Sequence, residues 1–206
     1  MLQFIHESAA VRVCFGAGAI TDLADEADRL GLHRLLLVSS RSRRALAQQA
    51  ADILGTRAVG IHAEAIMHVP VDTVTTARTA AERLGCDGYV AIGGGSTVGL
   101  AKAIALESGL PIIAIPTTYA GSEVTDILGQ TEAGRKTTIR DPRVLPEVVL
   151  YDPDLTLGLP IAMTVTSGLN AMAHAVEGLY AQDRNPVASL MAVEGLRALR
   201  DALPAI

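Results

Sequence analysis

The most informative segment of this sequence is Tyr89-Val90-Ala91-Ile92-Gly93-Gly94-Gly95-Ser96. It has the pattern of a buried strand that runs into three glycines, a hydroxyl and then a helix. Three successive glycines let the backbone approach a bulky anion closely, and the first N–H groups of the next helix are free to bind it. The spacing is neither G-x-G-x-x-G nor G-x-x-x-x-G-K-[ST], so a plain tight turn remains the alternative. We interpret the segment as a seat for a pyrophosphate.

On both sides of this segment, short apolar runs alternate with longer Ala-rich stretches of helical period. That order is typical of βαβ units, so we predict an α/β fold with a Rossmann-like, mostly parallel sheet. Strands are expected at residues 11–15, 34–39, 57–61, 88–92, 111–115 and 148–151. Helices are expected at residues 20–30, 42–54, 70–84 and 96–107, and a hairpin is expected from 125–130 and 136–140.

From about Leu155 onward the pattern is helical only. Two helices, at 161–181 and 186–202, are too few to bury a core of their own. They could pack on the first domain or on another chain, or the chain could be the front part of a longer protein. We place an α/β domain at 1–155 and part of an all-helical domain at 156–206, and we expect the helices to self-associate if no further layer covers them.

The composition, the apolar runs and the N-terminus argue against several classes of protein. A net charge of −5 gives no positive potential that would attract a nucleic acid. With 3% aromatic residues, few rings are available to stack on its bases. No apolar run is long enough to span a membrane, and the N-terminus lacks the pattern of a signal peptide. Cys14 and Cys86 belong to no C-x-x-C pair, so we expect two buried, reduced thiols in a soluble cytoplasmic protein.

Several hydroxyls follow predicted strands, and ligands bind beyond the carboxyl ends of strands in open α/β sheets. Thr117, Thr118 and Ser122 lie in a long polar loop that could hold phosphate, ribose or an amide, although such a loop could also be merely solvated. Ser39 ends the second strand, where a Rossmann-type site usually carries an acid for the ribose. Because no carboxylate there repels a 2′-phosphate, we expect NADH and NADPH both to bind.

Candidate catalytic residues are few. His174 follows Asn170 by four positions, so one helical turn puts both on the same face. The neutral amide of Asn170 is a weaker metal ligand than a carboxylate. His174 could alternatively be a hydrogen-bonded histidine of the core. Lys136 follows the hairpin turn and could hold a phosphate, a ribose or a carboxylate, or could be solvated. Lys102 lies six positions into the helix after Ser96, where contact with phosphate and a structural role are equally open.

Four motifs occur in the order seen in the iron-containing alcohol dehydrogenase superfamily: Gly93-Gly94-Gly95-Ser96, Pro116-Thr117-Thr118-Tyr119-Ala120-Gly121-Ser122-Glu123, Asp152-Pro153 and the Asn170/His174 helix. Within it, the chain most resembles the maleylacetate reductase branch. The resemblance implies a dinucleotide-binding domain at 1–155, NADH or NADPH as cofactor, and a homodimer. It also implies hydride transfer to the conjugated double bond of a dicarboxylate, maleylacetate, to give 3-oxoadipate in the degradation of aromatic compounds.

Two departures favour that branch. Metal-dependent members usually show Asp where this chain has Gly99 and Asn170. The resemblance therefore implies that no metal is needed, that His174 polarises the substrate or donates a proton, and that Lys136 or Asn170 holds cofactor or substrate. A metal-dependent alcohol or polyol dehydrogenase and an inactive nucleotide-binding fragment are the alternatives.

Overall fold

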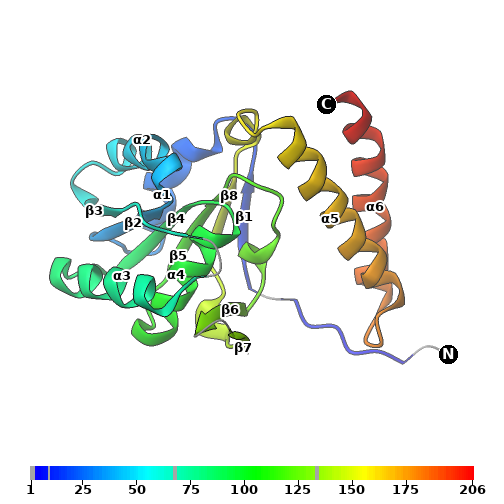
Figure 1. Ribbon diagram of the computed structural model, residues 1–206, viewed down its shortest axis with the longest axis horizontal. Helices are drawn as coiled ribbons and strands as arrows, with labels where there is room; N and C mark the ends of the chain where they lie inside the picture. Colours follow the sequence, from blue (N-terminus) through cyan, green and yellow to red (C-terminus); the bar gives the residue numbers. More distant parts are fainter. Residues whose placement is uncertain (1–2, 9, 67–68, 133–134) are drawn as a thin grey trace. The chain divides into compact units, whose positions relative to one another are not determined.

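A computed structural model describes residues 3–8, 10–66, 69–132 and 135–206. Its helices are α1 (Leu23–Arg29), α2 (Arg44–Leu54), α3 (Val71–Leu84), α4 (Gly95–Ser108), α5 (Ile161–Tyr180) and α6 (Pro186–Ala202) (Figure 1). Its strands are β1 (Arg12–Phe15), β2 (Leu35–Ser39), β3 (Ala58–His62), β4 (Gly88–Gly93), β5 (Ile112–Pro116), β6 (Ile127–Glu132), β7 (Arg135–Arg140) and β8 (Val148–Tyr151).

Six of these strands form one sheet in the order β1-β8-β5-β4-β2-β3. Every pairing in it is parallel, which confirms the predicted Rossmann-like architecture. The strand β3 lies on one side of β2, whereas β4, β5 and β8 follow on the other side. The direction in which the chain winds therefore reverses between β2 and β4.

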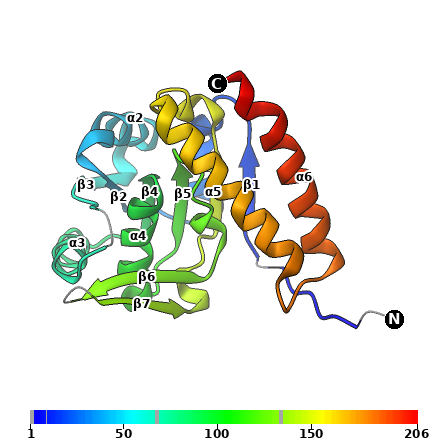
Figure 2. The same cartoon turned by 45° about the vertical axis from the view of Figure 1, so that its right-hand side comes forward.

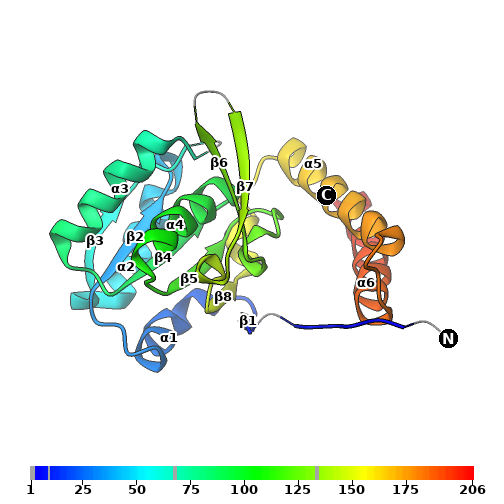
Figure 3. The ribbon, with the colours of Figure 1, turned by 90° about the horizontal axis from the view of Figure 1, so that it is seen from below.

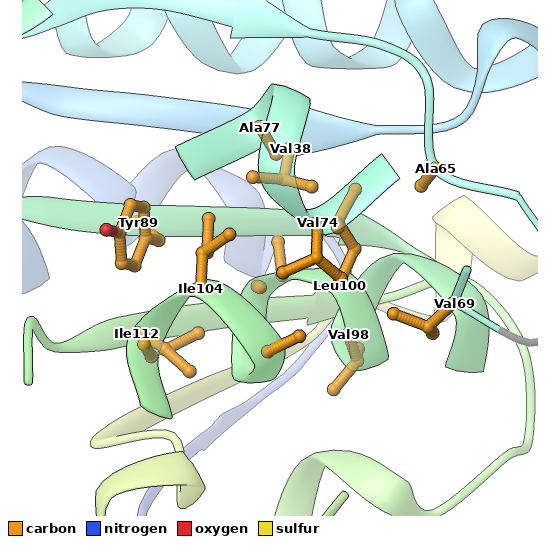
Figure 4. Close-up of a cluster of buried hydrophobic side chains, with 14 of the residues drawn as sticks. Val38, Ala65, Val69, Val74, Ala77, Tyr89, Val98, Leu100, Ile104 and Ile112 are labelled. Carbon is orange, nitrogen blue, oxygen red and sulfur yellow. The ribbon is translucent and has the colours of Figure 1, made fainter. Parts of the chain in front are cut away.

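Helices cover both faces of this sheet. On one face, α3 and α4 contribute Val74, Leu100 and Ile104 to an apolar cluster with β2 and β4 (Figure 4). On the other face, α1 and α2 contribute Leu23 and Ala50 to a second cluster. Strands that are buried on both faces need apolar residues at every position, and this is why they read as continuous apolar runs rather than as alternating patterns.

Most of the predicted boundaries agree with the structure to within about two residues. α3 begins directly after Pro70 and ends at Gly85, which has the left-handed backbone (φ +58°) typical of a helix C-terminus. The helices expected from 20 and 42 differ, because they begin as the 3-10 turns Ala19–Asp22 and Arg41–Arg43. Tightened end turns of this kind are common where the first N–H groups lack other partners.

The predicted hairpin is present as an antiparallel pair, β6 and β7, which stands apart from the six-stranded sheet (Figure 3). Its last described pairs are Thr131 with Lys136 and Glu132 with Arg135.

The two cysteines depart from expectation. Cys14 and Cys86 are free thiols, but both are half-buried rather than buried.

The chain divides into two compact parts. The sheet unit consists of residues 10–117 and 121–157, and the helical unit consists of residues 1–9, 118–120 and 158–206. In the helical unit, α5 and α6 lie side by side as a helical pair (Figure 2). Within the described ranges, no helix combines the length and the apolar character that crossing a membrane requires.

Candidate nucleotide-binding site

The reversal of winding between β2 and β4 brings three predicted site residues together. In open α/β sheets, ligands bind beyond the carboxyl ends of the strands at such a reversal. There, Ser39 at the end of β2 pairs with Ile92 of β4, immediately before the glycine triplet. Thr117, which follows β5, donates its backbone N–H to the carbonyl oxygen of Gly93 at 3.0 Å. Ser39, Gly93 and Thr117 thus lie at adjacent strand ends.

Gly93 makes the sharp transition from strand to helix. Its φ of +151° is one that residues with side chains rarely adopt. A Cβ added to it would lie 2.5 Å from Thr97 Oγ1 and 3.1 Å from Thr97 Cβ. Thr97 is itself buried and β-branched, so it has little freedom to move away. Only glycine fits at this junction.

The N-terminus of α4 is open for a ligand. Gly94 is the N-cap, and no side chain caps the helix. Gly95 and Ser96, the first residues of the helix, are half-buried. Their N–H groups have no partner within the helix, and the helix dipole favours negative charge at this end. This arrangement is suited to binding an anion.

Two predicted hydroxyls are buried without a hydrogen-bond partner. Within the described part of the chain, Ser39 Oγ and Ser122 Oγ have none. Thr97 Oγ1, beside Gly93, is in the same condition. Buried hydroxyls are normally paired, because leaving one unpaired costs free energy. Ser39 Oγ and Thr97 Oγ1 thus leave hydrogen-bonding capacity unused beside the strand ends, and Ser122 Oγ leaves it unused in the loop after β5.

Lys102, whose role the sequence leaves open, is a buried structural cation. It is 1% exposed, and its Nζ donates to the carbonyl oxygens of Ser122, Thr125 and Ile127 at 2.6, 2.7 and 2.9 Å. Burial lowers the pKa of Lys102 to about 8, against the opposing effect of the carboxylates of Glu123 and Asp126. One signal was available in the sequence: the helix is otherwise apolar on most faces, and such helices are buried all round.

Glu123 is a buried acid that the sequence analysis did not single out. It is 2% exposed, and its Oε1 accepts a hydrogen bond from the hydroxyl of Tyr151 at 2.8 Å. Its Oε2 has no partner among the described residues. Burial and the nearby Glu123 carboxylate raise the pKa of Tyr151. No periodic pattern marks this pair, because the two residues are 28 positions apart.

Asp152, part of the fourth motif, has a structural role. Its carboxylate accepts backbone N–H groups of Gly18, Ile20 and Asp154 at 3.1 to 3.2 Å. These bonds tie the turn after β1 to the end of β8. The motif therefore meets a requirement of the fold.

The other predicted site residues are placed as follows. Lys136 pairs with Thr131 in the hairpin, but its side chain lies outside the described residues. Thr118 belongs to the helical unit and is half-buried. Asn170 and His174 lie on α5 and are exposed, and His174 Nδ1 is 3.3 Å from Glu177 Oε2. His174 is thus no core histidine.

Two cavities in the sheet unit are separate from these residues. One of about 270 Å³ is lined by Cys86, Tyr89 and Ser108, and another of about 460 Å³ is lined by His62 and Arg83 among others. None of the predicted site residues lines either cavity. The carboxyl edge of the sheet therefore remains the candidate site.

Comparisons with known proteins agree with this fold. The family model described as iron-containing alcohol dehydrogenase matches residues 10–153. A maleylacetate reductase of Burkholderia cepacia is 60% identical over 203 residues, which are 98% of this chain and 58% of that protein. The crystal structure of a maleylacetate reductase from Agrobacterium tumefaciens superposes with a TM-score of 0.97 at 56% identity, over 100% of this chain and 59% of that one.

A more distant structure contains a nucleotide. The sulfoacetaldehyde reductase of Bifidobacterium kashiwanohense, in complex with NAD+, has a TM-score of 0.94 at 25% identity, over 100% of this chain and 61% of that one. The chain thus spans less than two thirds of the length of each of these relatives.

The family match corrects one expectation. We expected no metal, because Asn170 stands where metal-dependent members carry Asp, but the matching family is described as iron-containing, so that expectation is wrong. A single amide at one position says little about the metal content of a whole family. Among the described residues, however, no three His, Cys, Asp or Glu side chains are placed to hold a metal, so these residues do not form an iron site by themselves.

Sequence, fold and comparison converge. The family model covers residues 10–153, which include the parallel sheet and the Gly93–Gly95 junction. The resemblance inferred from the motifs is confirmed at this level. The chain belongs to the iron-containing alcohol dehydrogenase family.

Proposed function

We propose that this chain binds NADH or NADPH at the carboxyl edge of its sheet and takes part in the reduction of maleylacetate. The observation that carries the proposal is the uncapped N-terminus of α4 behind Gly93, where no Cβ fits. Such a junction admits a pyrophosphate close to the backbone and offers it N–H groups. The complex of the sulfoacetaldehyde reductase with NAD+ supports the choice of a nicotinamide nucleotide.

In this proposal, different residues bind different parts of the nucleotide. The backbone of residues 93–96 holds the pyrophosphate. Thr117, Thr118, Ser122 and Lys136 bind its ribose and amide groups. Ser39 faces the adenosine ribose without a negative charge, so both NADH and NADPH are accepted. The unpaired hydroxyls of Ser39 and Ser122 support this assignment, because a bound nucleotide would supply their missing partners.

We assign residues 1–155 to a dinucleotide-binding domain and residues 156–206 to part of an all-helical domain. We also propose a homodimer located in the cytoplasm, within the degradation of aromatic compounds. The two free thiols support a reducing compartment. The names of the relatives support the metabolic role.

When bound, NADH or NADPH would supply a hydride to the conjugated carbon–carbon double bond of maleylacetate. The electron pair of that bond moves toward the carbonyl oxygen, and a proton then adds to the neighbouring carbon to give 3-oxoadipate. His174 polarises the carbonyl or donates the proton, because its ordinary pKa lies close to working pH. Asn170 or Lys136 holds a carboxylate of the substrate or part of the cofactor. Catalysis depends on placing these groups where negative charge develops.

Two measurements test the proposal. Isothermal titration should detect NADH and NADPH binding to the purified chain, and loss of NADH absorbance should report turnover of maleylacetate. His174→Ala should lower kcat/KM by more than about threefold. Absence of nucleotide binding would refute the proposal. Nucleotide binding without any turnover would instead favour a chain that binds nucleotide and does not catalyse.

A second candidate is a metal-dependent alcohol or polyol dehydrogenase. The description of the family as iron-containing favours it. Activity toward alcohols that disappears on chelation and returns with Fe²⁺ or Zn²⁺ would support this candidate over maleylacetate reduction. Activity on maleylacetate with no measurable oxidation of alcohols would exclude it.

A further inference from the structure

Helix α4 carries two features that the proposed function does not connect. Its first turn forms the seat behind the glycine triplet, and Lys102 lies seven residues after Gly95. At 1.5 Å per residue, the two are about 10 Å apart along the helix axis. Lys102 is therefore too far along α4 to belong to the anion seat itself.

The ammonium of Lys102 is bound entirely by one short segment, Ser122–Ile127. Its Nζ donates to three backbone carbonyls of this segment and approaches Thr125 Oγ1 at 3.2 Å. Within the described ranges, no carboxylate lies at ion-pair distance from Lys102, since none of the salt bridges includes it. A buried charge is tolerated only when it is well bonded, so these carbonyls are essential partners of the lysine.

The dependence is mutual, because before Ile127, the first residue of β6, the segment contains only a 3-10 turn. It begins as the 3-10 turn Ser122–Val124 and becomes extended at Thr125. Inside the segment, the Thr125 hydroxyl donates to the Ser122 carbonyl at 2.9 Å. Among the described residues, the hydrogen bonds that join this segment to α4 are those of Lys102. Without the ammonium, three carbonyls would lose a charged donor.

The same segment presents one of the unpaired hydroxyls. Ser122 gives its carbonyl oxygen to Lys102, while its Oγ is buried and has no partner among the described residues. The position of this Oγ relative to α4 is therefore set through the backbone that Lys102 holds. A change at Lys102 would displace it without touching the seat at Gly93.

We propose that Lys102 is a positioning residue for nucleotide binding. It fixes the Ser122–Ile127 segment to α4, so that the Ser122 hydroxyl and the N-terminal turn of α4 meet one nucleotide as a single rigid surface. This inference rests on the proposed binding of NADH. It assigns to Lys102 no contact with the nucleotide.

A double-mutant cycle on the whole chain, with NADH affinity measured by titration, tests this role. Ser122→Ala should weaken NADH binding about fivefold, the effect of losing one hydrogen bond. Lys102→Met should weaken it by about tenfold or more, because small misplacements of a binding group are costly. The double variant should bind NADH with the affinity of Lys102→Met to within about twofold, since a displaced Ser122 hydroxyl no longer contributes a bond that Ser122→Ala could remove.

Two further variants separate positioning from loss of stability. Ile104→Val removes one buried methyl group from the same helix and no hydrogen bond to the segment, so its effect should be additive with that of Ser122→Ala. If Lys102→Met does not fold, Thr125→Ala replaces it in the cycle, because it loosens the same segment: it removes one bond to the ammonium together with the bond from the Thr125 hydroxyl to the Ser122 carbonyl. Thr125→Ala should then weaken NADH binding, and its effect should not add to that of Ser122→Ala.

Additive effects of Lys102→Met and Ser122→Ala on NADH affinity would overturn the role of Lys102 but leave the proposed function standing. Unchanged NADH affinity in either single variant would do the same. If the unaltered chain binds no NADH, the proposed function and this inference fall together. Binding by the unaltered chain with a non-additive cycle supports both.

Discussion

Gly93 is the residue on which the junction between β4 and α4 depends. Its positive φ and the 2.5 Å approach of an added Cβ to Thr97 Oγ1 act together, because one strains the backbone and the other creates a clash. Gly109, at the C-terminus of α4, shares only the first feature. Its φ is +68°, and an added Cβ would meet nothing within 4 Å.

Gly93→Ala should therefore destabilise the chain more than Gly109→Ala does. We expect a loss of about 3 kcal/mol in the free energy of unfolding for Gly93→Ala and of about 1 kcal/mol for Gly109→Ala, measured by urea denaturation. Gly93→Ala should also weaken NADH binding by more than about tenfold, because the seat is displaced. Equal losses of stability in the two variants would contradict the clash with Thr97.

At the scale of elements, hydrogen bonds of side chains, rather than of the backbone, join some helices to neighbouring strands. Glu26 of α1 is a clear case, because its carboxylate accepts hydrogen bonds from Arg12 of β1 at 2.9 Å and from Arg29 of α1 at 2.7 Å. Cys14 of β1 donates to it at 3.5 Å. Burial alone would raise the pKa of Glu26, but these hydrogen bonds outweigh it and the pKa is lowered from 4.5.

The stability of the link between β1 and α1 should therefore depend on pH. Below its ordinary pKa of 4.5, the unfolded chain binds a proton at Glu26 more readily than the folded chain does. The contribution of Glu26 is thus present above pH 4.5 and is lost as pH falls through the lower, folded pKa. Glu26→Gln should cost about 2 kcal/mol at pH 7, and the difference from the unaltered chain should shrink toward pH 3.5.

Chemical denaturation at both pH values measures this difference. Glu64→Gln is a suitable control, because Glu64 is 56% exposed and forms only a 3.6 Å pair with Arg41. Its effect should stay within about 0.5 kcal/mol at either pH. A gap between Glu26→Gln and the unaltered chain that does not change with pH would show that the lost bonds are not those of an ionised carboxylate.

At the scale of the whole molecule, the two units differ in how well they bury apolar residues. The strands β2, β4 and β5 of the sheet unit are buried throughout. In the helical unit, Leu190 and Met191 of α6 are 73% and 71% exposed. α5 adds further exposed apolar side chains, among them Ile161, Leu169 and Tyr180. An apolar surface of this kind is a site for association.

The purified chain should therefore self-associate through α5 and α6. Light scattering after size-exclusion chromatography should give a mass above that of one chain. Leu190→Lys combined with Met191→Lys should lower that mass, because both lysines keep the helix propensity and remove apolar contact. Ile66→Lys, at an exposed apolar residue outside these helices, should leave the mass unchanged. A monomeric unaltered chain would contradict this expectation.

The elements could be predicted because their signals are local. Apolar runs bounded by glycine and proline marked β4, α3 and α6, and Pro186 and Ala202 are the bounds of α6 in the structure as well. The 3-10 turns before α1 and α2 could not be separated from the helices, because both have similar residue patterns. For the candidate site, Ser39 and Gly93 could be named from their positions at strand ends, whereas Glu123 could not, since its partner Tyr151 is remote in sequence.

The sequence by itself determined which segments become strands and helices, their order along the chain, and the glycine junction before α4, because period, glycine and proline act through near neighbours. Only the tertiary structure decided that the direction of winding reverses between β2 and β4 and that Lys102 is bound by carbonyls of Ser122–Ile127. It also decided that the hydroxyls of Ser39 and Ser122 are buried without partners among the described residues. Those properties depend on which distant segments pack together and exclude water from a given polar group. No local pattern encodes that.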